Sequence, residues 1–298
     1  MPHDNIPFPV TFAAGAVAGI SEVLTLYPLD VVKTRMQLSV GKSDYNGTFD
    51  CLKKIVKNEG PHRLYRGILP PILMEAPKRA LKFASNDTYS KLWRKVFKRK
   101  DSSPALSILT GSCAGFTETF VVVPFELMKI RLQDVKNASK YNGTVDCFTK
   151  IVKQERILAL YNGFEATMWR HVVWNAGYFG VIQKIRNSLT PASSRIGEIR
   201  NNLIAGTIGG IFGTFLSTPF DVIKSRIQTV PRIAGQVPKY NWAYPALVTV
   251  AREEGFTALY KGFVPKVLRL GPGGGILLVV FNSVIEFYKR CLVHNASA

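Results

Sequence analysis

The stretch YPLDVVKTRMQ, residues 27–37, places an acid and two bases directly after one of the most apolar parts of the chain. Nearly the same stretch occurs twice more, as VPFELMKIRLQ at residues 123–133 and as TPFDVIKSRIQ at residues 218–228. The copies recur at intervals of about 95 residues, which is too long for the common solenoid repeats. Each copy is therefore expected to belong to a unit of several helices.

A second landmark repeats in step with the first. The tetrapeptides LYRG, LYNG and LYKG end at Gly67, Gly163 and Gly262. Because both landmarks keep the same register over almost the whole chain, the sequence predicts three tandem repeats that form one integral membrane domain. We place the repeats at residues 1–100, 101–195 and 196–298.

Each predicted repeat contains two apolar segments separated by a short amphipathic one. The apolar segments lie at residues 10–38 and 68–93, 104–133 and 164–187, and 199–229 and 263–289. Each is long enough to cross a hydrocarbon core of about 30 Å as a helix. The segments between them, such as FDCLKKIVKNE, predict short helices at the membrane surface.

The predicted fold class is an all-α membrane protein with six transmembrane helices around a pseudo-threefold axis. Two spans per repeat is an even number, so all three copies enter and leave the membrane on the same side. Parallel repeats of this kind are related by an axis along the membrane normal. GxxxG pairs occur at the same distance before each repeat proline, which favours close packing of the helices.

The composition fits a membrane protein with basic loops. The 298 residues include 39 Lys and Arg against 20 Asp and Glu, a net charge of +19, yet 47% of the residues are hydrophobic. The basic residues are spread between apolar segments, so we expect no nucleic-acid partner. The four cysteines lack metal-binding spacing, and no P-loop or nucleophile–base set occurs. We therefore expect no metal, no cofactor and no enzymatic activity.

Charged side chains after each repeat proline predict a ring of ion pairs. A single stripe of this kind, such as Asp30 with Lys33, also fits a solvated helix end with a weak intrahelical pair. Three stripes around a threefold axis can instead meet, acid to base, and close one mouth of the bundle as a gate. The predicted pairs are Asp30 with Lys129, Glu126 with Lys224 and Asp221 with Lys33, with Gln37, Gln133 and Gln228 as hydrogen-bonding braces.

PLDVVKTR, its two relatives and the LYxG landmarks resemble the mitochondrial carrier family along essentially the whole chain. The resemblance implies six tilted helices around a central cavity, a gate on the matrix side, and solute exchange across the inner mitochondrial membrane by alternating access. The second repeat departs from the family pattern, with Arg156 in place of a glycine and Asn162 in place of a basic residue. At the opposite, cytoplasmic gate, only Asp87 and Arg186 keep charge at matching positions. That gate is expected to close mainly by hydrogen bonds and packing.

Cations inside the second apolar segments predict an anionic solute. Ionisable groups within spans usually face an aqueous pathway or each other, so the alternative is that the arginines neutralise Glu22 and Glu118. Guanidinium groups on different helices can each hold a carboxylate through two hydrogen bonds, which favours a dicarboxylate. The candidate substrate-binding residues are Arg170 and His171 in the fourth span, Arg269 in the sixth, and Arg79 and Lys82 in the second.

Three stretches, YRGILPPILMEAPKRALKF, WRHVVWNAGYFG and LRLGPGGG, are similar to the keto-acid carriers of this family. The similarity implies exchange of 2-oxodicarboxylates such as 2-oxoadipate and 2-oxoglutarate, with His171 holding a keto or carboxylate oxygen or serving only in packing. Two alternatives stay open: a carrier of another carboxylate, such as citrate or malate, and a non-transporting basic membrane adaptor. The expected partners are dicarboxylate substrates and membrane lipid, cardiolipin included, and the chain is expected to be a monomer.

Overall fold

Six long and three short α-helices make up most of the computed structural model, which describes residues 7–40, 45–98, 104–137, 139–189, 195–232 and 238–296. The long helices are α1 (Phe8–Leu38), α3 (Leu69–Val96), α4 (Pro104–Gln133), α6 (Phe164–Ser188), α7 (Arg195–Thr229) and α9 (Phe263–Ala296). The short ones are α2 (Thr48–Glu59), α5 (Thr144–Glu155) and α8 (Ala243–Glu254), and 3₁₀ helices follow them at η1 (Pro61–Tyr65), η2 (Ile157–Tyr161) and η3 (Phe256–Tyr260). Within the described residues there is no strand, which agrees with the predicted fold class.

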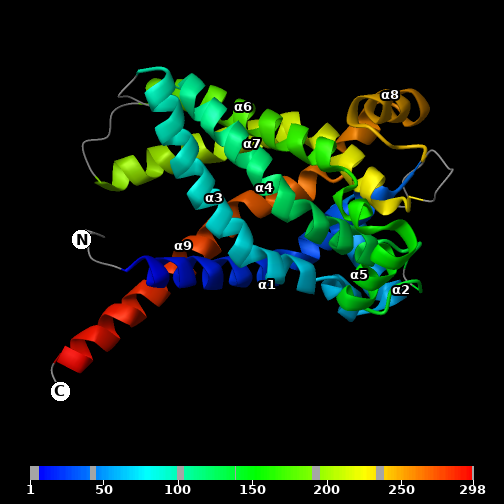
Figure 1. Ribbon diagram of the computed structural model, residues 1–298, viewed down its shortest axis with the longest axis horizontal. Coiled ribbons are helices and arrows are strands. Elements are labelled where there is room, and N and C mark those ends of the chain that lie inside the picture. Colours follow the sequence, from blue (N-terminus) through cyan, green and yellow to red (C-terminus); the bar gives the residue numbers. More distant parts are fainter. Residues whose placement is uncertain are drawn as a thin grey trace.

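The long helices form a bundle that is drawn together at one end and splayed at the other (Figure 1). Each long helix packs against the next along the chain, and α9 packs against α1, so the bundle is closed into a ring. All three short helices lie at the narrow end, whereas α1 begins and α9 ends at the splayed end (Figure 1). Every repeat therefore enters and leaves on the same side, as the even number of spans per repeat predicted.

Four long segments are apolar enough to be identified as membrane spans by hydropathy. These segments are Pro9–Leu38, Ala105–Gln133, Arg200–Thr229 and Phe256–Cys291. The two remaining long helices, α3 with 28 residues and α6 with 25, are also long enough, because 25 residues of helix extend about 37 Å. Charged side chains line the cavities from both helices, several of them on α3 and Arg170 on α6, and they lower the hydropathy without shortening the helices.

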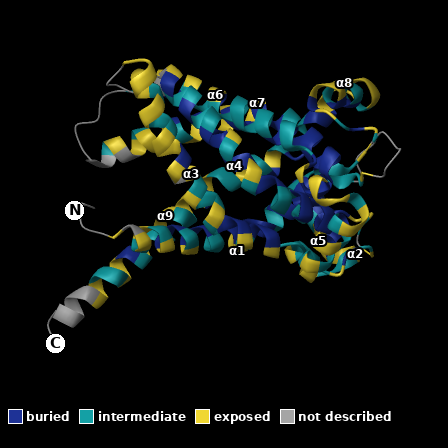
Figure 2. Cartoon of the chain, viewed as in Figure 1, coloured by how far each residue is buried: buried dark blue, intermediate teal, exposed yellow. Residues whose placement is uncertain are grey.

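Buried residues gather at the narrow end of the bundle (Figure 2). In the first repeat, Tyr27 and Val31 of α1 pack against Cys51 and Ile55 of α2, and each of the other repeats has a corresponding cluster. Each short helix is thus attached to the end of the long helix that carries the proline motif. This packing fixes the position of the motif's charged residues.

The glycines of the LYxG landmarks join each repeat to the next. Gly67, Gly163 and Gly262 have φ angles of +76°, +78° and +81°, in the region that favours glycine. A Cβ at Gly262 would lie 3.0 Å from the main-chain oxygen of Lys33, so a side chain there would be crowded as well as strained. Gly67 and Gly163 approach α4 and α7 as closely. The third repeat therefore docks on the first, as the first docks on the second and the second on the third.

Arg156 adopts the backbone conformation that the other repeats give to glycine. Its φ and ψ are 70° and 161°, against 87° and 159° at Gly60 and 87° and 164° at Gly255. This region is populated almost only by glycine and costs other residues of order 1–3 kcal/mol. The departure of the second repeat from the family pattern thus keeps the turn and introduces backbone strain.

Candidate functional site

Ion pairs between α1, α4 and α7 link the three repeats at the narrow end. Lys129 Nζ lies 2.7 Å from Asp30 Oδ2, Lys224 Nζ lies 2.6 Å from Glu126 Oε2, and Lys33 Nζ lies 3.6 Å from Asp221 Oδ2. Each pair joins two different repeats, and the partners are those that the sequence predicted. We refer to these six residues as the ring.

The predicted glutamine braces make different contacts from those expected. Gln37 accepts a hydrogen bond from Ser225 Oγ at 2.8 Å, and Gln133 donates one to the Tyr27 hydroxyl at 2.9 Å. Both bonds connect helices of different repeats without touching a ring ion pair. The side-chain nitrogen and oxygen of Gln228 are buried and have no partner among the described residues.

A second layer of ion pairs, which sequence reasoning missed, lies next to the ring. It consists of Arg35 with Glu59 at 2.9 Å, Arg131 with Glu155 at 2.8 Å and Arg226 with Glu254 at 2.9 Å. Each arginine stands two residues before a brace glutamine, and each acid ends a short helix of the same repeat. The recurrence of both residue types in all three repeats is a signal from which these pairs could have been predicted.

Three adjoining cavities lie inside the bundle beyond the ring. The gate cavity, of about 440 Å³, is lined by the ring residues Asp30, Lys33, Glu126, Lys129 and Lys224 together with residues of α9. The outer cavity, of about 600 Å³, lies between α3, α4 and α6 and is lined by residues such as Asn86, Ser90, Arg94, Ser107 and Tyr178. The side cavity, of about 400 Å³, is lined by Glu75, Lys78 and Arg79 of α3.

Arg170 lines all three cavities. Lys266 borders the outer and gate cavities, and Arg269 borders the gate and side cavities. Lys82 and His171 border the outer and side cavities. The predicted substrate-binding residues on different helices therefore line neighbouring cavities that share wall residues.

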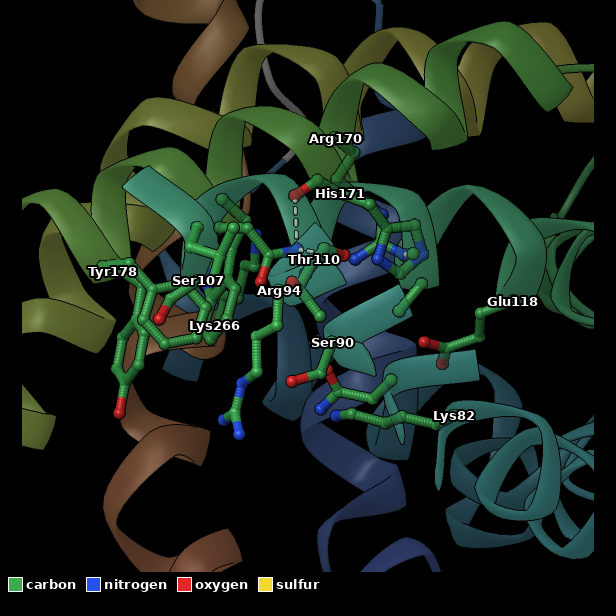
Figure 3. A pocket seen from close by; sticks show the side chains of 18 residues that line it. Lys82, Ser90, Arg94, Ser107, Thr110, Glu118, Arg170, His171, Tyr178 and Lys266 are labelled. Carbon is green, nitrogen blue, oxygen red and sulfur yellow. Dashed lines mark hydrogen bonds between the residues drawn. The ribbon is translucent and has the colours of Figure 1, made fainter. Parts of the chain in front are cut away.

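The outer cavity shows how side chains from three helices converge (Figure 3). Figure 3 shows Glu118 and Lys82 toward one end of this cavity and Tyr178 toward the other. Glu118 is buried, and neither its side chain nor that of the exposed Lys82 has a hydrogen-bond or ion-pair partner among the described residues. The cavity thus presents an unpaired cation and an unpaired carboxylate.

Arg170 pairs with a ring acid and not with Glu118, the alternative considered from the sequence. Its Nε lies 3.6 Å from Asp221 Oδ1, and its Nη2 lies 2.7 Å from His171 Nε2. The ring of His171 packs against α4 at Gly115, where an added Cβ would lie 3.0 Å from the histidine Cβ. His171 therefore combines a packing role with a place at the cavity wall.

Arg269 contacts two carboxylates of α1. Its Nη1 donates to Asp30 Oδ1, and its Nη2 donates to Glu22 Oε1 at 3.0 Å. The alternative in which this arginine neutralises Glu22 is therefore present in this conformation, together with a contact to the ring. The guanidinium remains at the wall of two cavities, with 29% of its side chain exposed.

Other predicted residues are held within their own helix. Arg79 donates from Nε to Glu75 Oε1 at 2.6 Å, so both members of this pair belong to α3. Asp87, predicted for the cytoplasmic gate, pairs with Lys91 of α3 at 2.6 Å, and Arg186 on α6 is exposed. The structure does not bring Asp87 and Arg186 together, and a cytoplasmic gate built on them stays a prediction.

Lys266 is a site residue that sequence reasoning missed. Its Nζ donates to Asp221 Oδ2 and, at 3.0 Å, to Ser217 Oγ. Residues at the same distance after the LYxG glycine in the other repeats are Pro71 and Thr167, so comparison of the repeats gives no signal for it. Its place one turn before Arg269 was the available signal.

Comparison with known proteins places this arrangement among transporters. The family model for mitochondrial carrier protein matches residues 4–97, 100–193 and 197–291. The chain is 61% identical to mitochondrial citrate transporter D of Aspergillus niger over 96% of each chain, and 56% identical to mitochondrial 2-oxodicarboxylate carrier 2 of Saccharomyces cerevisiae over 95% of each chain. It is also 40% identical to the mitochondrial 2-oxodicarboxylate carrier of Homo sapiens over 93% of each chain.

Proposed function

The chain belongs to the mitochondrial carrier protein family, and on that premise we propose that it exchanges 2-oxodicarboxylates across the inner mitochondrial membrane by alternating access. It is a multi-pass membrane protein of mitochondria with helices long and apolar enough to span the bilayer. Relatives that are 40% and 56% identical over almost the full chain are named 2-oxodicarboxylate carriers. The expected substrates are 2-oxoadipate and 2-oxoglutarate.

The observation that carries this proposal is the position of Arg170 at the junction of the three cavities. Charged groups inside a membrane protein are costly and usually line the path of an ion or substrate. Arg269 reaches the same space from a different helix. Two guanidinium groups on separate helices suit a solute with a carboxylate at each end, because each can hold one carboxylate through paired hydrogen bonds.

The ring supplies the matrix gate of the proposed mechanism. In this conformation its ion pairs join the three repeats, which supports a gate that closes the cavities toward the narrow end of the bundle. Substrate held by Arg170 and Arg269 lies next to Asp221 and Asp30, and it competes with these acids for the arginines. Opening of the ring then exposes the substrate to the matrix while the splayed end closes.

The remaining parts of the proposal concern organisation and partners. We propose three repeats at residues 1–100, 101–195 and 196–298, of which positions 1, 100, 101 and 298 lie outside the described residues. One bundle contains all the cations and the whole ring, which supports a monomer as the transporting unit. Large apolar side chains such as Leu203 and Phe215 are exposed, and membrane lipid, cardiolipin included, is proposed to cover them.

Reconstitution tests the proposed function. Purified protein in liposomes preloaded with unlabelled 2-oxoglutarate should take up labelled 2-oxoglutarate and 2-oxoadipate, and liposomes preloaded with chloride should take up little. The Arg170→Ala protein in the same liposomes provides the matched control. Equal uptake with either internal solution, or none in either, would contradict the exchange of 2-oxodicarboxylates.

Citrate is the second candidate substrate. A relative that is 61% identical is named a citrate transporter. Lys82 and Lys266 add cations to those of the two arginines at the cavity walls, so a third carboxylate could also be held. Liposomes preloaded with citrate distinguish the two candidates, because a citrate carrier would take up labelled citrate faster than labelled 2-oxoglutarate.

A further inference from the structure

The charges of the side chains around the gate cavity do not sum to zero. Six cations line this cavity: Lys33, Lys129, Arg170, Lys224, Lys266 and Arg269. Four carboxylates contact them: Glu22, Asp30, Glu126 and Asp221. With every member of these ion pairs ionised, the set has a net charge of +2.

The surplus charge is concentrated at one place. Lys224 balances Glu126, and Lys129 with Arg269 balances Asp30 with Glu22. Asp221, in contrast, contacts three cations at once, namely Lys33, Arg170 and Lys266.

Lys266 is well placed to supply part of this surplus to a substrate. It borders both the outer and the gate cavity, and 16% of its side chain is exposed, whereas Asp221 is only 2% exposed. Lys33 and Arg170 each lie 3.6 Å from Asp221, so two cations stay beside that acid when Lys266 turns to a substrate. A carboxylate in the cavity can therefore take the lysine as a partner without leaving Asp221 alone.

We propose that Lys266 is a specificity-determining residue that sets the net charge of the gate cavity at +2, which matches a dicarboxylate dianion. The inference rests on the proposed function. A 2-oxodicarboxylate neutralises the cavity, whereas citrate, a trianion at neutral pH, leaves one negative charge in excess. A dicarboxylate is therefore the anion that the cavity neutralises without excess, and changing the count by one should change the ratio of the affinities for the two anions.

The test compares the binding of 2-oxoglutarate and citrate to a series of variants. Ligand-dependent shifts of the melting temperature of purified protein give a dissociation constant for each anion, so the measurement does not depend on transport. Lys266→Gln lowers the cavity charge by one, and Glu22→Gln raises it by one without touching the ring. Lys266→Arg keeps the charge, and Lys150→Gln removes an equal charge from the surface helix α5 as the matched control.

Lys266→Gln should weaken 2-oxoglutarate binding about tenfold, the cost of one charge-assisted contact. Because Coulomb attraction scales with the ligand's charge, the same change should weaken citrate binding about thirtyfold. Glu22→Gln should shift the ratio in the opposite direction, toward citrate. Lys266→Arg and Lys150→Gln should leave the ratio of the two dissociation constants at the wild-type value.

Two results overturn the inference. One is a Lys266→Gln protein whose ratio of dissociation constants equals that of Lys150→Gln. The other is a Glu22→Gln protein whose ratio stays at the wild-type value, and this result is informative even where Lys266→Gln fails to fold. Failure of the proposed function gives a different outcome, because wild-type protein would then bind neither 2-oxoglutarate nor 2-oxoadipate.

Discussion

Lys224 lies 2.6 Å from Glu126 across the boundary between the second and third repeats, and Glu126 contacts no other cation among the residues that the structure describes. Because Glu126 takes part in no second ion pair, unlike Asp30 and Asp221, this pair is the simplest place to reverse charges. Glu126→Lys or Lys224→Glu alone should abolish most 2-oxoglutarate exchange, because each places like charges together. The double reversal should recover part of the exchange, since the attraction survives the swap. A double variant no more active than the worse single one would rule out this pair as part of the gate.

Reversing Asp221 and Lys33 should give the opposite outcome. A lysine at position 221 would face Lys266 and Arg170 as well as its reversed partner. The like charges offset the restored pair, so the double reversal should stay as inactive as the single ones in the same liposome assay. Recovery equal to that of the Glu126 and Lys224 swap would mean that Lys266 and Arg170 do not act on Asp221.

Arg170→Ala tests the substrate site with little disturbance of the ring. The change removes a charge-assisted contact, so binding of 2-oxoglutarate should weaken by roughly ten- to a hundredfold. Asp221 keeps Lys33 and Lys266 as partners, so the melting temperature should change little. Arg170→Lys keeps the charge but loses the paired N–H donors of the guanidinium group, so it should restore binding only in part. Wild-type affinity in Arg170→Ala would remove this arginine from the site.

The strain at Arg156 predicts a stabilising substitution. Glycine adopts its φ of 70° and ψ of 161° without a Cβ clash, so Arg156→Gly should increase the free energy of unfolding by about 1 kcal/mol. Gly255→Ala is the reciprocal control, because an added Cβ there meets no atom within 4 Å and only the backbone is strained. It should lower the melting temperature while Arg156→Gly raises it. A lower melting temperature for Arg156→Gly would mean that the arginine side chain stabilises the turn.

The thiols of the surface helices predict a pattern of chemical modification. Burial raises the pKa of Cys51 and of Cys147 to about 12, so almost no thiolate exists at neutral pH. N-ethylmaleimide should therefore modify the exposed Cys291 and spare both buried cysteines until the protein unfolds. Peptide mapping by mass spectrometry measures each site separately. Rapid labelling of Cys51 in the folded protein would contradict the packing of α2 against α1.

The same pKa shift predicts a loss of stability in alkali. The folded state holds the thiol proton more tightly than the unfolded chain, whose cysteine pKa is about 8.5. The stabilisation is complete below that pH and is lost as the pH rises toward 12. As the pH rises from 8 to 10, the melting temperature of Cys51→Ala should fall less than that of the wild type. An equal loss in both proteins would show that this thiol does not contribute.

The ring was predictable because the repeats carry the same residue types in the same register. Asp30, Glu126 and Asp221 stand two residues after equivalent prolines, and a threefold arrangement then determines which lysine each one meets. The contacts of Arg170 and Arg269 with ring acids were not predictable. They depend on the relative depth of neighbouring long helices, which is set by packing and not by the order of residues.

The membrane spans show a second limit of prediction from the sequence. Hydropathy identifies α1, α4, α7 and α9 but not α3 or α6. Those two helices were predicted from their length and from their place after each LYxG landmark. The charged residues that lower their hydropathy are among those that line the cavities, such as Lys82 and Arg170. The charged residues that indicate the function are therefore also the ones that keep α3 and α6 from being identified as membrane spans by hydropathy.

The docking of the last repeat on the first has a consequence for biogenesis. Gly262 lies against the main chain of Lys33, and Arg226 donates to the carbonyl of Gln37, 189 residues earlier in the chain. The end of α1 therefore acquires these partners only when the third repeat docks on it, whatever the order in which the repeats enter the membrane. A chain that ends before α7 would leave the end of α1 without these partners, and the bundle would stay open at its first helix.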